Sequence, residues 1–129
     1  MAKFTYDHIH LRSPDPEATA RYYEHMFGAE IVRTVQDGTT RIDLKLGGTD
    51  IFIAPVGAGS GVNPPPVTPY QGLDHFGLAV TGIEEVVAEL KAKGAEFTME
   101  LTEIRPGVRI CFVRGPQGVS IEVLERTGG

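Results

Sequence analysis

Apolar and polar residues follow one order of patterns along this chain, and that order occurs twice. A period of two predicts a strand, and apolar residues three or four apart predict a helix. In the first half these patterns predict strand, helix, strand, strand, strand over residues 4–12, 13–27, 30–35, 40–46 and 50–54. In the second half the same order is predicted over residues 73–80, 83–93, 97–101, 108–113 and 119–124. Each half is therefore predicted to be a βαβββ module.

Short motifs repeat with the patterns. Residues 7–11 and 74–78 both read D-H-x-x-L, and Gly-Ala-Glu follows both predicted helices, at 28–30 and 94–96. The two histidines are 67 residues apart (75 − 8) and the two glycines 66 (94 − 28). A repeat of this kind decides how the whole fold is interpreted. It predicts one unit written twice, with a histidine near the start of each copy.

Residues 55–72 break the pattern and connect the two copies. They contain five prolines and four glycines without periodicity. We therefore expect a single domain over residues 1–129, in which modules 1–54 and 73–129 are joined by the linker 55–72. A loop of this length is either a passive linker or a functional lid.

Strand alternation assigns the residues of each strand to two faces. The face that must pack under the helices is apolar. It is predicted to contain Ile9, Leu11, Ile42, Leu44, Ile51, Ile53, Phe76, Leu78, Val80, Ile121 and Val123. The opposite face is predicted to carry His8, His10, Arg12, Arg41, Asp43, Phe52, His75 and Glu122. Three of the chain's four histidines fall on this one face, while His25 lies in the first predicted helix and receives no role.

Two imidazoles and one carboxylate on a shared face can hold a divalent metal and leave positions open for a substrate. His8, His75 and Glu122 are the candidate set, and these donors suit Fe, Mn, Ni, Zn or Co. Without a second thiol, Cys111 does not suggest a structural zinc site. The alternative is that these are ordinary histidines on solvated strands.

Composition excludes several classes of protein. The net charge is −5 with no run of like charges, which disfavours nucleic-acid binding. No stretch approaches the roughly 20 apolar residues of a membrane span, and the N-terminus has no apolar signal sequence. One cysteine, which can form no intrachain disulfide, is typical of a reduced compartment, so a cytoplasmic location is expected.

The motifs resemble those of the vicinal oxygen chelate superfamily, which includes glyoxalase I, extradiol dioxygenases, methylmalonyl-CoA epimerase, and fosfomycin and bleomycin resistance proteins. The opening D-H-I-H-L-R at 7–12, then D-P-E-A at 15–18 and Y-Y-E-H-M-F-G at 22–28, carries the likeness. So do L-D-H-F-G-L-A-V at 73–80 and V-R-G-P-Q-G-V-S-I-E-V-L-E at 113–125.

The resemblance implies an α+β fold in which two βαβββ modules form a cupped, mixed eight-stranded sheet with the helices on its outer face. It also implies a divalent metal, a small-molecule substrate and a homodimer, within which the modules pair in one chain or are exchanged between two. By the resemblance His8, His75 and Glu122 are the metal ligands. Aligning Gly48 with Gly118 puts Phe52 at the family's fourth ligand position, where glyoxalase I has Glu or Gln. Phenylalanine cannot ligate a metal.

The resemblance therefore implies a metal-dependent, glyoxalase-like lyase or isomerase of the lactoylglutathione lyase type. A three-ligand site is also what an extradiol dioxygenase uses with Fe(II), and a bleomycin-resistance-like protein that only binds its ligand is a third alternative. Glu122 or His10 is expected as the catalytic base, with His10 otherwise a fourth ligand or a hydrogen-bonding neighbour. Arg12, Arg41, Phe52, Lys45 and Arg109 are candidate contacts to a substrate, the cations to an anionic tail. The His-x-His of residues 8–10 would also suit a cupin, but the helix that follows disfavours that fold.

Overall fold

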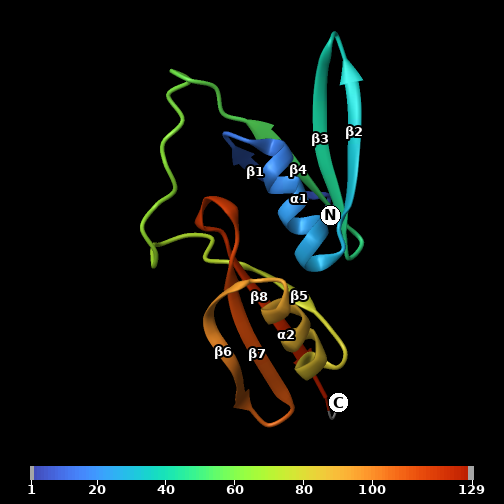
Figure 1. Ribbon diagram of the computed structural model, residues 1–129, viewed down its shortest axis with the longest axis vertical. Helices are drawn as coiled ribbons and strands as arrows, with labels where there is room; N and C mark the ends of the chain where they lie inside the picture. The colour runs from blue at the N-terminus through green and yellow to red at the C-terminus, as the bar shows by residue number, and fades with distance from the viewer. Residues whose placement is uncertain (1, 128–129) are drawn as a thin grey trace. The chain divides into compact units, whose positions relative to one another are not determined.

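The computed structural model describes residues 2–127, and the chain divides into two compact units, Met1–Asn63 and Pro64–Gly129, called unit 1 and unit 2 below. Unit 1 contains β1 (His8–Ser13), α1 (Pro16–Phe27), β2 (Glu30–Gln36), β3 (Thr39–Leu46) and β4 (Thr49–Pro55) (Figure 1). Unit 2 contains β5 (Phe76–Ala79), α2 (Ile83–Ala92), β6 (Glu96–Arg105), β7 (Val108–Arg114), a short 3-10 turn (Pro116–Gly118) and β8 (Ser120–Arg126). The predicted α+β class and the two βαβββ modules are confirmed. The domain and linker boundaries stay a prediction, and positions 1, 128 and 129 lie outside the described residues.

The eight strands are divided between two four-stranded sheets of one plan, in the orders β1-β4-β3-β2 and β5-β8-β7-β6. In each sheet the first strand runs parallel to the last, and the other neighbours are antiparallel. The first and last strands of each unit are therefore hydrogen-bonded neighbours. This pairing brings the start of each D-H-x-x-L motif beside the strand that closes the same unit.

The first helix begins and ends where its sequence predicts. The carboxylate of Asp15 accepts from the backbone N–H of Ala18 at 3.1 Å, and Pro16 occupies the first turn. Gly28 ends the helix with φ +72°, a left-handed conformation that glycine adopts without strain. Ser13 does not cap the helix. Its hydroxyl accepts a hydrogen bond from the Thr19 hydroxyl at 2.7 Å, which connects the end of β1 to the helix.

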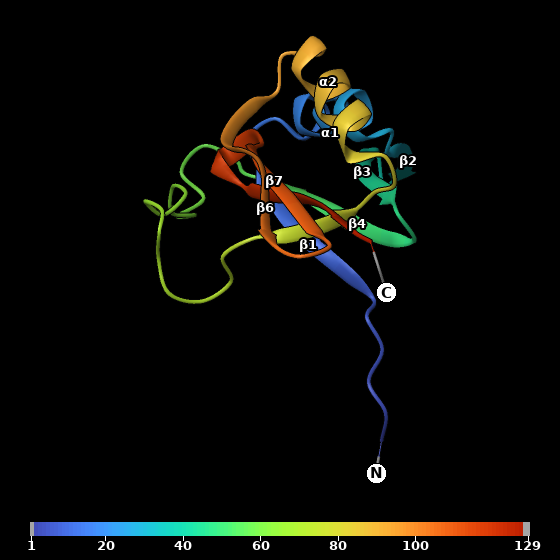
Figure 2. The same ribbon diagram turned by 90° about the horizontal axis from the view of Figure 1, so that it is seen from below.

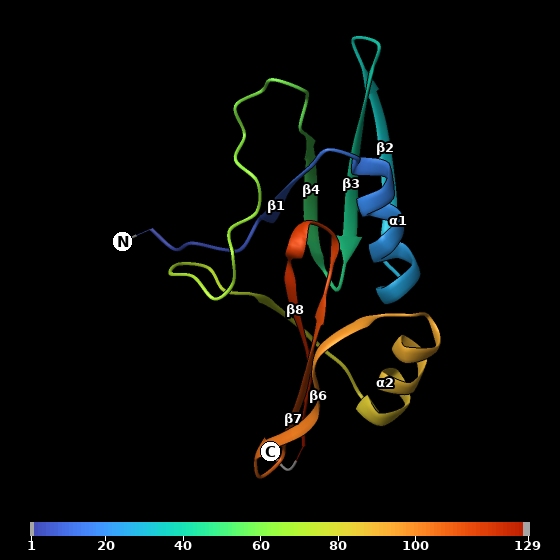
Figure 3. The ribbon, with the colours of Figure 1, turned by 60° about the vertical axis from the view of Figure 1, so that its left-hand side comes forward.

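Each helix packs on its own sheet and buries one face of it (Figure 3). The buried apolar residues of unit 1 are Ala20, Tyr23, Ala29, Leu44, Ile51 and Ile53. Those of unit 2 are Ile83, Val87, Leu90, Ile110, Cys111, Val113, Ile121, Val123 and Leu124. The predicted helix-side residues of β3, β4 and β8 are buried, except Ile42, which is half-buried. The predicted helix-side residues of β1 and β5 are also half-buried. Ile110 and Leu124 are buried although they alternate with the helix-side residues of their strands.

Both first strands begin later than their sequence pattern predicts. β1 begins at His8 rather than residue 4, because its partner β4 begins at Thr49, level with residue 7. Residues 4–7 lead into β1 as an extended segment, in which Phe4 and Tyr6 are exposed (Figure 2). β5 likewise begins at Phe76 rather than 73, opposite Ile121. β6 is longer than predicted and reaches Arg105, directly before the turn, with register shifts along the way.

No helix among residues 2–127 is both long and apolar enough to cross a membrane. Residues 56–75, which include most of the predicted linker, form neither helix nor strand.

Candidate functional site

His75 and Glu122 meet on the face of the unit 2 sheet that is turned away from α2. Glu122 lies opposite Gly77 in the parallel ladder of β5 and β8, so His75 is its diagonal neighbour on the same face. The Nε2 atom of His75 lies 3.1 Å from Oε1 of Glu122. On the other side of the ring, Nδ1 lies 2.8 Å from Oδ2 of Asp74. The imidazole is thus held between two carboxylates.

These two carboxylates decide the protonation of the ring. The hydrogen bond to Asp74 raises the pKa of His75 above 6.5, burial lowers it by less, and Glu122 raises it further. In the protonated ring Nδ1–H donates to Asp74 and Nε2–H donates to Glu122, and loss of the Nε2 proton frees a lone pair that can bind a metal. A histidine oriented by a carboxylate at its second nitrogen is the usual arrangement of a metal ligand.

Apolar groups and a glycine flank this pair on the neighbouring strands. Phe112, opposite Glu122 in the β7–β8 ladder, presents its ring at 88° to His75 with 4.8 Å between ring centres. Gly77 leaves room for the carboxylate, because a Cβ there would stand 3.3 Å from Cδ2 of Leu124 and 3.5 Å from Oε1 of Glu122. Alanine at this position would press on the Leu124 side chain and would only touch the Glu122 carboxylate.

Unit 1 carries an equivalent histidine with different neighbours. His8 binds the preceding aspartate as His75 does, with 2.7 Å between its Nδ1 and Oδ2 of Asp7. Its ring stacks on Phe52, with ring centres 4.3 Å apart at 28°. His10 pairs with Phe52 across β1 and β4, as Gly77 pairs with Glu122 across β5 and β8. Phe52 is thus the counterpart of Glu122 by strand register, and a phenyl ring faces His8 where a carboxylate faces His75.

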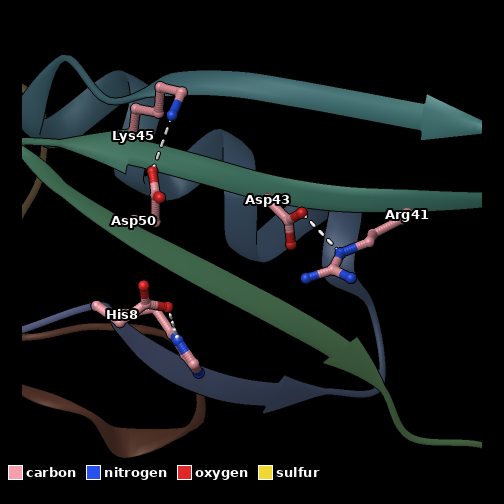
Figure 4. A network of polar contacts seen from close by, with 6 residues as sticks. His8, Arg41, Asp43, Lys45 and Asp50 are labelled. Atoms are coloured by element: carbon pink, nitrogen blue, oxygen red, sulfur yellow. Dashed lines mark hydrogen bonds and ion pairs between the residues drawn. The ribbon is translucent and has the colours of Figure 1, made fainter.

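A row of charged side chains crosses unit 1 on the same face, with α1 behind the strands in this view (Figure 4). Nε of Arg41 donates to Oδ2 of Asp43 at 2.7 Å, and the guanidinium carbon lies 4.7 Å from the centre of the Phe52 ring. The other oxygen of Asp43, Oδ1, is buried without a hydrogen-bond partner. Lys45 donates to Asp50 at 2.9 Å (Figure 4). The Arg41 side chain is therefore held through its Nε atom, and its two terminal nitrogens remain able to donate to another group.

The remaining predicted contacts divide between the two faces. His10 and Arg12 are exposed on β1 with His8. Arg109 instead donates to Glu84 of α2 and to the buried Glu125, at 2.7 and 2.9 Å. It belongs to the helix side of unit 2, and its role as a substrate contact stays a prediction.

A divalent metal fits the donors of unit 2. Two ligands each about 2.1 Å from one ion, at a right angle, are about 3.0 Å apart. The 3.1 Å between Nε2 of His75 and Oε1 of Glu122 matches this spacing. Among residues 2–127 no three His, Cys, Asp or Glu side chains gather into a group that could hold a metal ion.

Four residues of these surroundings had no role in the sequence-based prediction: Asp7, Asp74, Asp43 and Phe112. The two aspartates were visible as the first letter of the repeated D-H-x-x-L motif. Asp43 was placed on the right face without a role. Phe112 had no sequence signal, because its position depends on the register of β7 against β8.

Comparison with known proteins agrees with the fold. The sequence profile of the Glyoxalase/Bleomycin resistance protein/Dioxygenase superfamily matches residues 5–123. A probable chloroplastic lactoylglutathione lyase of Arabidopsis thaliana is 28% identical over 124 residues, which is 92% of this chain and 35% of that protein. The chain thus spans about a third of that relative's length.

Solved structures resemble the chain over most of its length. The glyoxalase family protein of Enterococcus faecalis is 27% identical with a TM-score of 0.71, covering 94% of this chain and 97% of that one. A glyoxylase/bleomycin resistance protein/dioxygenase domain of Frankia sp. EAN1pec has a TM-score of 0.76 at 22% identity, covering 99% and 96%. With the profile matching nearly the whole chain, this protein belongs to the Glyoxalase/Bleomycin resistance protein/Dioxygenase superfamily.

Proposed function

We propose that this protein is a metal-dependent, glyoxalase-like lyase or isomerase that acts on a small oxygenated substrate. His8, His75 and Glu122 supply the ligands of a divalent ion, which is Fe, Ni, Zn, Mn or Co. The observation that carries the proposal is the pair of donor atoms 3.1 Å apart on His75 and Glu122, with the histidine oriented by Asp74. The matching Asp7–His8 pair supports His8 as the third ligand.

The bound metal supplies a Lewis acid that polarises two neighbouring oxygens of the substrate. The chain supplies the proton transfer. A base removes a proton from the hydroxyl-bearing carbon next to the carbonyl and returns it to the carbonyl carbon, while the hydroxyl proton passes to the former carbonyl oxygen, so that the substrate isomerises without gain or loss of atoms. His10 is exposed beside His8, with 6.1 Å between ring centres, and its ring can take the proton in its neutral form. Glu122 is the alternative base, because one of its oxygens is free of His75.

The sequence relatives support this class of chemistry. Three proteins of Arabidopsis and Brassica named as lactoylglutathione lyases, one as probable and one as putative, match 92% of the chain at 25–28% identity, although the chain covers only 35–43% of their length. A homodimer is part of the proposal, as the superfamily to which the chain belongs suggests. The ligands of one metal then come either from one chain or from two.

A second candidate is a ring-cleaving dioxygenase of the extradiol type. It is favoured by Phe52, which stands at the counterpart of Glu122 and reduces the protein ligands to two histidines and one carboxylate. A protein that binds its ligand without catalysis, as in the bleomycin-resistance branch of the superfamily, is the third candidate, and it needs no metal.

Metal analysis of the purified protein separates the enzymes from the binding protein. We expect stoichiometric metal that is lost in His75→Ala and kept in His25→Ala, a matched control whose imidazole lies on α1. Absence of metal, with no uptake of Fe, Ni, Zn, Mn or Co, would overturn the proposal. Isomerisation of the methylglyoxal–glutathione hemithioacetal then tests the lyase, and oxygen consumption with catechol tests the dioxygenase.

A further inference from the structure

Residues 3–7, called the N-terminal arm below, lead into β1 without a strand beside them (Figure 2). β1 is an edge strand in the order β1-β4-β3-β2, and its pairing with β4 begins only at His8. No backbone hydrogen bond joins residues 3–6 to any other part of the described chain, residues 2–127. An extended edge with free N–H and C=O groups is a template on which another strand can pair.

The N-terminal arm also carries the two most exposed large apolar side chains of residues 2–127. Phe4 is 94% exposed and Tyr6 is 92% exposed. An open hollow of about 400 Å³ lies beside them and is lined by residues 4–8. Single apolar residues on a surface are ordinary. Two aromatic rings on one face of an unpaired, extended segment instead indicate a surface that a protein partner covers.

The sequence of the N-terminal arm is complementary to itself in one antiparallel register. Centred on Thr5, this register places Phe4 of one copy opposite Tyr6 of the other on one face. On the other face it places Lys3 opposite Asp7. Directly opposed aromatic residues and opposite charges both stabilise antiparallel strands. Registers centred on Phe4 or Tyr6 separate the lysine from the aspartate, so charge complementarity selects the register centred on Thr5.

Both charged groups of the N-terminal arm are available for this pairing. Lys3 is exposed and makes no hydrogen bond or ion pair among the described residues. The Asp7 side chain is 85% exposed and binds Nδ1 of His8 through Oδ2, which leaves its other oxygen for a lysine. In the register centred on Thr5, Lys3 of a second copy therefore contacts the carboxylate that orients His8.

Unit 2 provides an internal contrast. The residues 67 positions later, 70–74, read Y-Q-G-L-D, so glutamine stands at the position of Phe4 and tyrosine at that of Lys3. Gly72, at the centre, has φ +106°, which takes the backbone out of the extended conformation. The βαβββ module therefore does not need an aromatic, extended lead-in to its first strand. The N-terminal arm has these features without a structural role in its own unit.

We propose that the N-terminal arms of two copies of this chain pair as an antiparallel ribbon centred on Thr5. The ribbon covers four aromatic rings on one face and forms two Lys3–Asp7 ion pairs on the other. This inference goes beyond the proposed function, which includes a homodimer without naming the surface that forms it. Each ring buries about 150–250 Å², so four rings supply roughly half of a standard interface of about 1,600 Å². We therefore expect a dimer that dissociates on dilution.

Analytical ultracentrifugation of the full chain over a dilution series, with EDTA present, measures the dissociation constant of the dimer. Phe4→Ser and Tyr6→Ser should each raise it about tenfold or more, because buried aromatic residues are the usual hot spots of an interface. Val35→Ser is the matched control. It removes another apolar side chain of unit 1, 71% exposed on β2, and should leave the dissociation constant unchanged.

Charge reversal tests the register. Lys3→Asp and Asp7→Lys each bring like charges opposite each other across the ribbon, and each should weaken the dimer. The double variant Lys3→Asp/Asp7→Lys restores opposite charges in the register centred on Thr5. It should recover most of the affinity of the parent.

Thr5→Cys tests the centre of the ribbon. Its two copies would face each other with Cα atoms about 4.5–5.5 Å apart, which is within the range of a disulfide. Lys3→Cys would place its two copies four residues apart along the ribbon, or about 13 Å. Mild oxidation should therefore cross-link Thr5→Cys and not Lys3→Cys, as non-reducing electrophoresis shows. The native Cys111 is buried and does not compete.

Three results would overturn the ribbon: a chain that stays monomeric at every concentration, a dimer that Phe4→Ser and Tyr6→Ser leave intact, or equal cross-linking at positions 3 and 5. Its failure can be distinguished from failure of the proposed function, because the Phe4→Ser/Tyr6→Ser double variant should bind metal as the parent does. Metal binding without the ribbon removes only this inference. A ribbon in a protein that takes up no metal removes only the metal-dependent reaction.

Discussion

The two units place the same Asp–His pair on the same fold and then surround it with opposite chemistry. In unit 2 a carboxylate faces the histidine and an aromatic ring lies on the next strand. In unit 1 the aromatic ring faces the histidine and the carboxylate lies on the next strand. The strand registers give three pairs of equivalent positions: Glu122 of unit 2 corresponds to Phe52 of unit 1, Phe112 corresponds to Asp43, and Gly77 corresponds to His10. The next row of residues across each sheet is apolar in unit 2, whereas in unit 1 it carries Arg12 and Arg41.

The difference lies almost wholly on one face of each sheet. Most positions under the helices are apolar in both units because each sheet has to bury its helix side, and the ion-paired Arg109 and Glu125 of unit 2 are the exception. The buried apolar strand residues of unit 1 are Leu44, Ile51 and Ile53, and those on the equivalent face of unit 2 are Cys111, Val113, Ile121 and Val123. The opposite face has no such constraint. A repeated module can therefore keep its core while its two copies carry different side chains on the opposite face.

The largest expected effect comes from removing the carboxylate that only unit 2 has. Glu122→Gln should lower metal affinity by at least about 100-fold, since loss of groups that merely orient a ligand already costs 10- to 100-fold. Phe52→Leu, at the equivalent position of unit 1, should leave metal affinity unchanged because phenylalanine donates nothing to a metal. Competition with a metal-binding dye measures both affinities.

Equal losses in Glu122→Gln and Phe52→Leu would contradict this assignment. They would mean that both variants disturb packing and that the register-based difference between the units has no role in metal binding. Circular dichroism of both variants checks that each retains its fold.

A smaller effect is expected from the aspartates that both units share. Asp74→Asn and Asp7→Asn should each lower metal affinity by roughly 10- to 100-fold, because each removes the carboxylate that orients a histidine at Nδ1. The measurement is the same dye competition, with Asp50→Asn as a control on the His8 face. Similar losses support both histidines as ligands. A loss confined to Asp74→Asn would remove His8 from the metal site.

Much of this arrangement is predictable from the sequence, since period-two alternation depends only on the strand and not on its neighbours. It put His8, His10, Arg12 and Arg41 on one face and Glu122 on the equivalent face of its own sheet, in agreement with the strand registers. The Gly48–Gly118 alignment paired Phe52 with Glu122, and the ladders agree.

What alternation could not predict depends on contacts between strands and on side-chain reach. The sequence did not predict that Arg109 donates to Glu84 and Glu125 on the helix side. The start of β1 was placed too early because residues 4–7 alternate like a strand, whereas a strand also needs a neighbour to pair with. The stacking of Arg41 on Phe52 depends on rotamers that no periodicity encodes.

The second-to-third strand turns of the two units offer a comparison in stability. Gly38 and Gly107 have φ of +75° and +79°, so alanine at either should cost about 1–2 kcal/mol in backbone strain. A Cβ at Gly38 meets nothing, but at Gly107 it would lie 2.3 Å from the carbonyl oxygen of Thr127. It would also disturb the hydrogen bond that the Thr127 N–H donates to the Gly107 carbonyl, in which nitrogen and oxygen are 2.7 Å apart. We expect Gly107→Ala to cost about 1 kcal/mol or more beyond Gly38→Ala in urea unfolding of metal-free protein. Equal losses of unfolding free energy in the two variants would show that the β6–β7 turn can move enough to accommodate the Cβ atom.

The smallest expected effect is on proton binding in metal-free protein. Because Asp74 and Glu122 raise its pKa, His75 should titrate above 6.5 in ¹H–¹³C NMR of the imidazoles. A raised pKa in the folded protein means that protonated His75 stabilises the fold. That contribution is fully present below pH 6.5 and is lost as pH rises through the folded-state pKa. Asp74→Asn should lower the pKa of His75 more than Glu122→Gln does, because the Asp74 hydrogen bond is the larger cause. The reverse order would make Glu122 the main partner of the ring, and in that case the proton between Nε2 and Oε1 occupies the position proposed for the metal.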